Sequence, residues 1–429
     1  MTRSYQSVCL ATLLVAALVL RIGYCVVVSG LGESPSSYRE YVIAGQRLLT
    51  HGTLVSPFVP DESTSEPSSL LPPAYATLVA GVYGVLGVET PTATAALKIV
   101  NALASTLVVL FAFLIARRMF NGWIAWLAAH VTAVNPMMIG FTDYIWDTSL
   151  FTLGVVLTVW VALRLSERSF GCAVWTGYGL FLGGLALLNP ALTIVYPFLV
   201  LWPLHRAKCW HLRHVVRPVA ASVLGWLVAI TPWTVRNYVH FHELSYIRGG
   251  FGLELWLGVC PEADAHGSAV YRTQFPLKNP DVQNRVAEIG ERAFIAESGN
   301  RAREAIAADP VRYLKLTSIR FVDYWLGTTF SHSGTDLSGW PRSRARAAVL
   351  LFMSAEVLLS VLCVCAVRRM HADVRWLAAI VLVFCIVYCL THVQVRFRAP
   401  TEPLIAVILA GAVGGLFRNR KRYDPRKAA

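Results

Sequence analysis

The chain has 429 residues, of which 55% are hydrophobic and 15% are charged, and its mean hydropathy is +0.53. Soluble globular proteins carry charge on about a quarter of their residues, so this composition excludes an ordinary water-soluble protein. The formal net charge of +13 would suit a nucleic-acid-binding protein, but much of the positive charge lies in short segments between apolar runs. The charge therefore indicates membrane topology, and we predict no nucleic-acid partner.

Apolar runs recur along the whole chain. A helix needs roughly 20 apolar residues to cross the hydrocarbon of a bilayer. The sequence predicts an all-α polytopic membrane protein with about 10 or 11 transmembrane helices. The expected spans are 8–29, 97–116, 122–141, 148–165, 172–189, 190–204, 217–233, 347–367, 375–391 and 402–417, with a weaker one at 71–88.

The distribution of Lys and Arg predicts which loops face the cytoplasm, because short basic loops stay on that side. The basic segments are Arg117 and Arg118, Arg164 to Arg168, 205–217, 368–375 and 418–427. With a cytoplasmic N-terminus, the segment 71–88 then adds no net crossing, so it is re-entrant or lies flat, unless Arg117 and Arg118 break the rule. We read the first span as an anchor, because Arg21 interrupts it and no clear cleavage site follows.

This topology divides the chain into four regions. Residues 1–234 form an N-terminal transmembrane region that includes a first outer loop at 31–70. Residues 235–345 form a long extracytoplasmic segment with amphipathic helices, 346–417 the C-terminal transmembrane helices, and 418–429 a basic cytoplasmic tail. In the long segment we expect a glycine-punctuated loop at GGFGLELWLG, a charged helix over 281–308 and an interfacial helix at VRYLKLTSIRFVDYWLG.

Acidic residues collect on the predicted outer face. The candidates for chemistry are Glu33, Glu40, Asp143 and Asp147. Such a carboxylate can act as general base toward an acceptor hydroxyl, or can hold a metal that neutralises a departing phosphate. The alternative is that these acids are solvated or cap helix starts.

Three arginines lie just outside the predicted membrane: Arg236, Arg396 and Arg398. A guanidinium offers several planar donors to phosphate oxygens, so these residues are candidates to bind the phosphate of a lipid carrier. Anchoring to lipid headgroups is the alternative. The nine cysteines form no disulfide or zinc pattern, and we predict no certain cofactor, although a divalent metal is possible.

Four stretches, taken in order, resemble membrane glycosyltransferases of the C-type fold, such as protein O-mannosyltransferases and the lipid A aminoarabinose transferase (glycosyltransferase family 39). They are PPAYATLVAGVYGVLG with ARRMFNGWIAWLAAHVTAVNP; PWTVRNY with GGFGLELWLG; ADPVRYLKLTSIRFVDYW; and VRFRAPTEPLIAVILAG. The resemblance implies transfer of a sugar from a polyprenyl-phosphate carrier to a protein or lipid hydroxyl, outside the cytoplasm. It also implies an active site on the extracytoplasmic side of the cell (inner) membrane.

The chain departs from this family at two places. The family carries an aspartate base early in the first outer loop, whereas GESPSSYREY has Ser36 or Ser37 nearest that place, flanked by Glu33 and Glu40. Glu33 is our first candidate for the base and Glu40 the second. Relatives often carry an arginine before the proline of LLNPA, where this chain has Asn189.

Carried over from the family, Asp143 or Asp147 matches the acid of the second outer loop, and Arg396 with Arg398 matches a basic pair facing the carrier phosphate. Two other functions remain open. One is a transporter or flippase of a lipid-linked substrate, against which stands the scarcity of charge within the spans. The other is a non-catalytic relative of the transferase. The sequence does not identify the sugar, the acceptor or the oligomeric state.

Overall fold

The computed structural model describes residues 3–34, 39–59, 66–208, 211–242, 245–264, 268–326 and 372–416, with isolated positions 351, 352, 355 and 358. Within these ranges the regular structure is helical, apart from one isolated antiparallel bridge between Val55 and Pro67. The expected span at 347–367, apart from the four isolated positions, and the tail at 418–429 lie outside the described residues. So do Ser36 and Ser37 of the first outer loop.

Six stretches of the described chain are long and apolar enough to cross a membrane. They are α1 (Arg3–Val28), α4 (Pro91–Met119), α7 (Thr148–Leu165), α10 (Leu212–Phe241), α18 (Ala372–Leu390) and Val395–Gly414, which contains α19 (Val395–Arg398), η2 (Ala399–Thr401) and most of α20 (Glu402–Leu416). Shorter apolar helices are α3 (Pro73–Leu86), α5 (Gly122–Val134) and α8 (Cys172–Leu188). The prediction of an all-α polytopic membrane protein is confirmed.

The two longest N-terminal helices run antiparallel. Arg21 Nε of α1 donates to Ser105 Oγ of α4 over 2.7 Å, and Lys98 Nζ, two turns earlier in α4, donates to Gly30 O just after α1 over 2.9 Å. The end of α1 therefore lies beside the beginning of α4, and the chain between them starts and ends on one side. This confirms that the segment containing α3 adds no net crossing.

Two expected spans are broken in the structure. α5 ends at Val134, because Asn135 turns out of the helix and its side chain caps the short helix α6 (Pro136–Gly140). The span expected at 190–204 divides into η1 (Pro190–Val195) and α9 (Tyr196–Arg206), and α9 has only 11 residues. Such a helix is about 16 Å long, about half of the hydrocarbon thickness.

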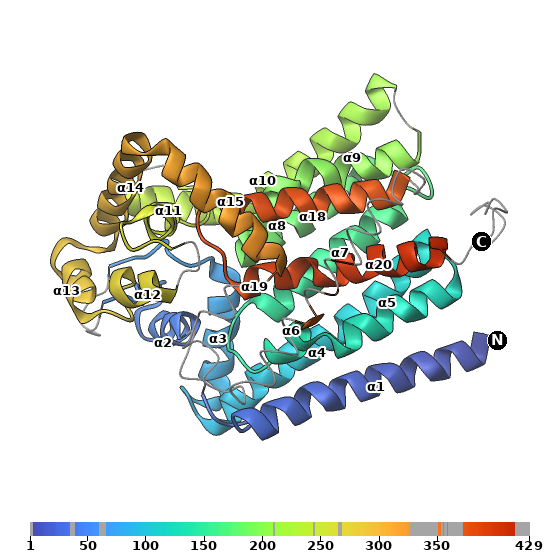
Figure 1. Ribbon diagram of the computed structural model, residues 1–429, viewed down its shortest axis with the longest axis horizontal. Helices are drawn as coiled ribbons and strands as arrows, with labels where there is room; N and C mark the ends of the chain where they lie inside the picture. Colours follow the sequence, from blue (N-terminus) through green and yellow to red (C-terminus); the bar gives the residue numbers. More distant parts are fainter. Residues whose placement is uncertain are drawn as a thin grey trace.

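The extramembrane helices gather at one end of the bundle, opposite the start of α1 and the end of α20 (Figure 1). This end contains α2 (Glu40–His51), α11 (Phe251–Val259), α12 (Ser268–Gln274), α13 (Pro280–Ile289), α14 (Glu291–Ala308) and α15 (Pro310–Leu326). The charged helix predicted over 281–308 is interrupted at Gly290, whose φ is +84°.

The prediction of a glycine-punctuated loop at GGFGLELWLG is wrong from Phe251 onward, because Phe251–Val259 forms the helix α11. A Cβ at Gly252 would lie 2.4 Å from Ile295 O and 3.1 Å from the Gly299 Cα of α14. The glycine thus allows two helices to approach closely, a use that sequence alone does not distinguish from a loop.

The opposite end of the bundle carries the basic residues that set the predicted topology. Arg118 at the end of α4 pairs with Glu167, and Arg206 at the end of α9 pairs with Asp373 over 2.9 Å. Arg164 at the end of α7 also faces Glu167 over 3.4 Å. Basic loops distant in sequence therefore meet at one end, as the topology prediction requires.

Candidate active site

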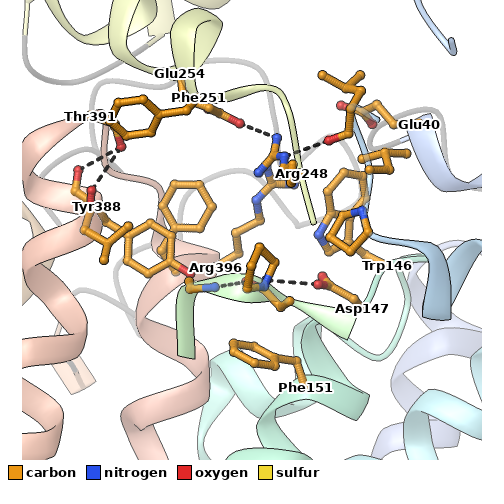
Figure 2. A pocket seen from close by; sticks show the side chains of 18 of the residues that line it. Glu40, Trp146, Asp147, Phe151, Arg248, Phe251, Glu254, Tyr388, Thr391 and Arg396 are labelled. Atoms are coloured by element: carbon orange, nitrogen blue, oxygen red, sulfur yellow. Dashed lines mark hydrogen bonds and ion pairs between the residues drawn. The ribbon is translucent and has the colours of Figure 1, made fainter. Parts of the chain in front are cut away.

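A cavity of about 290 Å³ lies at the end of the bundle that carries α2, α11 and α12 (Figure 2). Its lining comes from the start of α2, the loop before α3, the start of α7, η1, the segment from Tyr246 to α11, α12, and the chain from the end of α18 to η2. Most lining residues are aromatic or aliphatic, and the polar minority includes both charged and neutral side chains. A concave, mainly apolar pocket with a few convergent polar groups is typical of a small-molecule site.

Two carboxylates that the sequence singled out line this cavity. Glu40 is the first residue of α2 and its side chain is 9% exposed. Asp147 is the residue before α7, and its Oδ2 accepts a hydrogen bond of 3.0 Å from Asn189 Nδ2. Burial raises the pKa of Glu40 above its usual range and raises that of Asp147 to about 6, although Arg248 and Arg396 oppose the shift.

Two arginines face the same cavity. The Arg396 guanidinium lies over the Trp146 ring, 4.4 Å from its centroid, and 5.2 Å from that of Phe397. Arg248 Nε donates to Leu70 O over 2.7 Å, and its Nη2 forms an ion pair with Glu254 (Figure 2). Stacking and ion pairing hold both guanidinium groups in place.

Two further polar residues of the cavity, Glu254 and His392, lie next to Arg248. His392 Nδ1 lies 3.2 Å from Glu254 Oε2, and His392 Nε2 lies 2.6 Å from the Tyr271 hydroxyl. Burial lowers the pKa of His392 to about 4, so the ring is neutral near pH 7 and its contact with Glu254 is not an ion pair at that pH. Burial raises the pKa of Glu254, but Arg248, His392 and Arg396 together bring it below its usual range.

The other predicted acids lie elsewhere. Asp143 forms a buried ion pair of 2.8 Å with Lys98 and also accepts from Ser29 over 2.6 Å. Glu33 is exposed and is not part of the cavity lining. The structure therefore brings Glu40 and Asp147 together and leaves Asp143 and Glu33 outside the cavity.

Two of the three predicted phosphate-binding arginines make contacts within the fold. Arg236 donates to Ser68 O over 2.8 Å and to Thr53 Oγ1 over 2.9 Å, which ties α10 to the first outer loop. Arg398 is buried and pairs with Glu402 over 2.5 Å. Of the three, only Arg396 lines the cavity.

Sequence reasoning missed Arg248, Glu254, His392 and Tyr271. A signal existed for Glu254, which is the single charged residue of the apolar stretch FGLELWLGV. His392 also stands beside the arginines of HVQVRFRAP. No comparable pattern marks Tyr271.

The arrangement has the groups for acid–base chemistry on an anionic substrate. A carboxylate with a pKa near 6 can accept a proton near neutral pH, and two arginines can stabilise a phosphate. The described residues bring no three His, Cys, Asp or Glu side chains together around one point, so we assign no metal ion to the cavity.

No family model and no curated protein matches the chain. Solved structures are similar in chain path. ArnT from Cupriavidus metallidurans bound to undecaprenyl phosphate has 13% identity and a TM-score of 0.44, covering 96% of this chain and 79% of ArnT. Its apo state has 14% identity and a TM-score of 0.38, covering 96% and 78%. The Archaeoglobus fulgidus oligosaccharyltransferase tethered to an acceptor peptide has 13% identity and a TM-score of 0.47, covering 95% and 49%.

Proposed function

We propose that this chain is a membrane glycosyltransferase that moves a sugar from a polyprenyl-phosphate carrier to a hydroxyl of a protein or lipid acceptor. One observation carries the proposal: a single buried cavity beside the membrane helices combines Arg248 and Arg396 with the carboxylates Glu40 and Asp147. The sequence resemblance to C-type glycosyltransferases is the reason to choose sugar transfer among the reactions that such a cavity permits.

The two arginines would bind the carrier phosphate. Both are held by neighbouring groups, Arg396 by Trp146 and Arg248 by Glu254 and Leu70 O, so little side-chain entropy is lost when the anion binds. Their positive charge also stabilises the negative charge that develops on the phosphate as it leaves, and this stabilisation lowers the barrier of the reaction. The polyprenyl tail would lie among the apolar spans, with membrane lipid around it.

The carboxylates would supply the base. The acceptor oxygen attacks C1 of the sugar, its proton moves to a carboxylate oxygen, and the C1–O bond to phosphate breaks with its electron pair going to the phosphate. Direct displacement inverts the configuration at C1. We assign the base to Asp147, because Asn189 orients it and its pKa of about 6 suits proton uptake near neutral pH, with Glu40 as the second candidate.

The proposed location is the cell (inner) membrane, with the cavity on the extracytoplasmic side. The support is the basic cluster at the opposite end of the bundle, where Arg118, Arg164 and Arg206 meet Glu167 and Asp373. Basic helix ends are retained in the cytoplasm, so the cavity would open outside.

The test is transfer of radiolabelled sugar from synthetic polyprenyl-phosphate donors by the purified protein in lipid. We expect Asp147→Asn to reduce turnover by about two to four orders of magnitude, the usual effect of losing a general base. Glu33→Gln is the matched control, because Glu33 is exposed and outside the cavity. The opposite pattern would identify Glu33 as the base: turnover is then lost in Glu33→Gln and is full in both Asp147→Asn and Glu40→Gln.

The same preparation separates the two rival functions. A transporter or flippase would move a fluorescent polyprenyl phosphate between leaflets and transfer no sugar. A non-catalytic relative would do neither, although it would bind the carrier. Either result with folded wild-type protein contradicts the proposal.

A further inference from the structure

Three carboxylates of the described chain line the cavity, and two of them have a partner. Asp147 accepts a hydrogen bond from Asn189, and Glu254 pairs with Arg248. Glu40 makes no ion pair and no hydrogen bond to another described residue, although only 9% of it is exposed (Figure 2). Among the described residues, Glu40 is therefore the cavity carboxylate whose oxygens are available to a ligand.

The position of Glu40 at the beginning of α2 does not account for its burial. It is the first residue of the helix, where the helix dipole stabilises a carboxylate. A solvent-exposed carboxylate at a helix N-terminus gains from the same interaction, so the dipole does not require the side chain to line a cavity.

Burial of a carboxylate without a partner destabilises a fold, because its oxygens lose water and gain no hydrogen-bond donor. A bound molecule with a hydroxyl group would supply that donor, since a carboxylate oxygen accepts and a hydroxyl donates. The unpaired side chain at the cavity wall thus indicates a contact that is completed by substrate.

The charges around Glu40 indicate which part of a substrate it would contact. Burial raises its pKa, and the positive charges of Arg396, Lys278 and Arg248 oppose that rise. Arg396 and Arg248 are the groups that would bind the carrier phosphate, so Glu40 faces the surroundings of that phosphate. A carboxylate and a phosphate repel each other unless a hydrogen-bond donor lies between them. In a polyprenyl-phosphate donor the group attached to the phosphate is the sugar, which carries hydroxyl donors.

We propose that Glu40 is a specificity-determining residue that accepts a hydrogen bond from one hydroxyl group of the donor sugar. This inference rests on the proposed function. It gives the two carboxylates different partners, because Asp147 takes the proton of the acceptor and Glu40 recognises the sugar. Glu40 is then no longer a candidate for the base.

The test compares the wild type with Glu40→Met on the hexosyl polyprenyl phosphate that gives the highest turnover, and on its monodeoxy analogues. Met is similar in length to Glu and has only a weakly accepting sulfur. We expect Glu40→Met to lower kcat/KM for the parent donor by about tenfold or more, because a hydrogen bond to a charged group is lost. With the analogue that lacks the recognised hydroxyl, both proteins should have equal kcat/KM. Comparing them on the same donor cancels differences in reactivity among the donors.

Two further variants separate recognition of the sugar from proton transfer. Asp147→Asn is the matched control, because loss of the base should lower kcat/KM by the same factor with every donor. Glu40→Gln keeps an accepting carbonyl oxygen, so it should discriminate between the parent donor and the analogue better than Glu40→Met does. Gln would not restore the function of a base.

Carrier binding verifies that the variants are folded. Polyprenyl phosphate without a sugar should bind to Glu40→Met at least as tightly as to the wild type, because a negative charge near the two arginines has been removed. Weaker binding would show that Glu40 supports the phosphate site, and this result would overturn the inference.

The remaining outcomes are distinct. If Glu40→Met lowers kcat/KM equally with every donor, Glu40 acts on a group that all donors share, and the inference is wrong while the proposed function stands. If Glu40→Met matches the wild type with every donor, Glu40 contacts no hydroxyl of the sugar and the inference also fails. If the wild type transfers none of the donors, the proposed function itself fails.

Discussion

At the scale of single residues, position relative to the cavity separates side chains that look equivalent in the sequence. Asp143 and Asp147 stand four residues apart in FTDYIWDTSL, yet Asp143 is neutralised by Lys98 and Asp147 faces the cavity. Arg396 and Arg398 stand two residues apart, yet only Arg396 lines it. Each pair provides a matched experiment.

The pKa of Asp147 predicts the pH dependence of transfer. Burial raises this pKa from 3.8 to about 6, so the carboxylate is ionised above that pH and protonated below it. A base must be unprotonated, so kcat/KM should rise with pH through a midpoint near 6 and level off above it. The measurement is a pH–rate profile between pH 4.5 and pH 8. A flat profile over this range would exclude Asp147 as the base.

Substitution by Met should have different effects at Arg396 and at Arg398. Arg396→Met removes a guanidinium from the cavity and should weaken binding of polyprenyl phosphate while the protein stays folded. Arg398→Met removes the ion-pair partner of the buried Glu402, and breaking a buried pair costs about 3–5 kcal/mol. Thermal unfolding in detergent and carrier binding should separate them. Equal loss of stability in both variants would contradict the distinction.

At the scale of elements, one face of α4 supports the loop that carries Trp146 and Asp147. Lys98, Asn101 and Ser105 recur at i, i+3 and i+7, on one side of the helix. Lys98 pairs with Asp143, Asn101 Nδ2 donates to Tyr144 O over 2.8 Å, and Ser105 Oγ donates to Met138 O over 2.8 Å. These polar positions in an apolar helix therefore fix the second outer loop.

Because α4 supports this loop, we expect substitution of Lys98 to change the position of Asp147, although the two residues are not in contact. Lys98→Met removes the ion-pair partner of the buried Asp143, so the loop should shift and turnover should fall by about tenfold or more, with a changed midpoint of the pH–rate profile. Lys98→Arg keeps the charge and should retain more activity. A purely structural role would lower the yield of folded protein and leave the pH profile of the folded fraction unchanged.

Helix α8 packs against α10 through glycines. A Cβ at Gly179 would lie 1.9 Å from Ser222 O, and one at Gly225 would lie 2.1 Å from Thr176 O. Small residues allow membrane helices to approach to backbone contact. The pairing positions the stretch after α8, where Asn189 meets Asp147.

At the scale of the whole molecule, the cavity and the basic cluster lie at opposite ends of one helical bundle. Figure 1 shows α2, α11 and α12 at one end and the end of α20 at the other. All the extramembrane helices of the described chain collect at the cavity end, so the site is enclosed by outer segments as well as by helix ends. This separation makes sidedness testable with one native cysteine.

The native Cys172 is exposed at the start of α8, in the predicted cytoplasmic half. A membrane-impermeant maleimide should label it only after the membrane is permeabilised. Glu33→Cys should instead be labelled in intact cells, because Glu33 is exposed in the first outer loop. The Cys172→Ser protein is the control for background. Labelling of Cys172 in intact cells would place the cavity on the cytoplasmic side.

The sequence by itself determined the membrane class and most of the long spans, and it predicted an outer position for the acids. It left open whether 71–88 adds a crossing. These properties depend on local hydropathy and on the sum of charges in short loops, and both quantities can be read directly from the sequence. The spans at 122–141 and 190–204 were read as continuous. The first is broken at Asn135–Pro136 inside its apolar run, and the second changes from a 3-10 helix to an α-helix after Val195, where its hydropathy gives no signal.

Only the tertiary structure decided which charged residues form the site. Glu40, Asp147, Arg248, Glu254 and Arg396 come from four segments, and their meeting depends on how α2, α7, α11 and α19 pack together. The roles of Asp143, Arg236 and Arg398 were decided in the same way, by partners distant in sequence. A charge carries the same information in the sequence whether it faces a cavity or a buried partner, and packing alone separates the two.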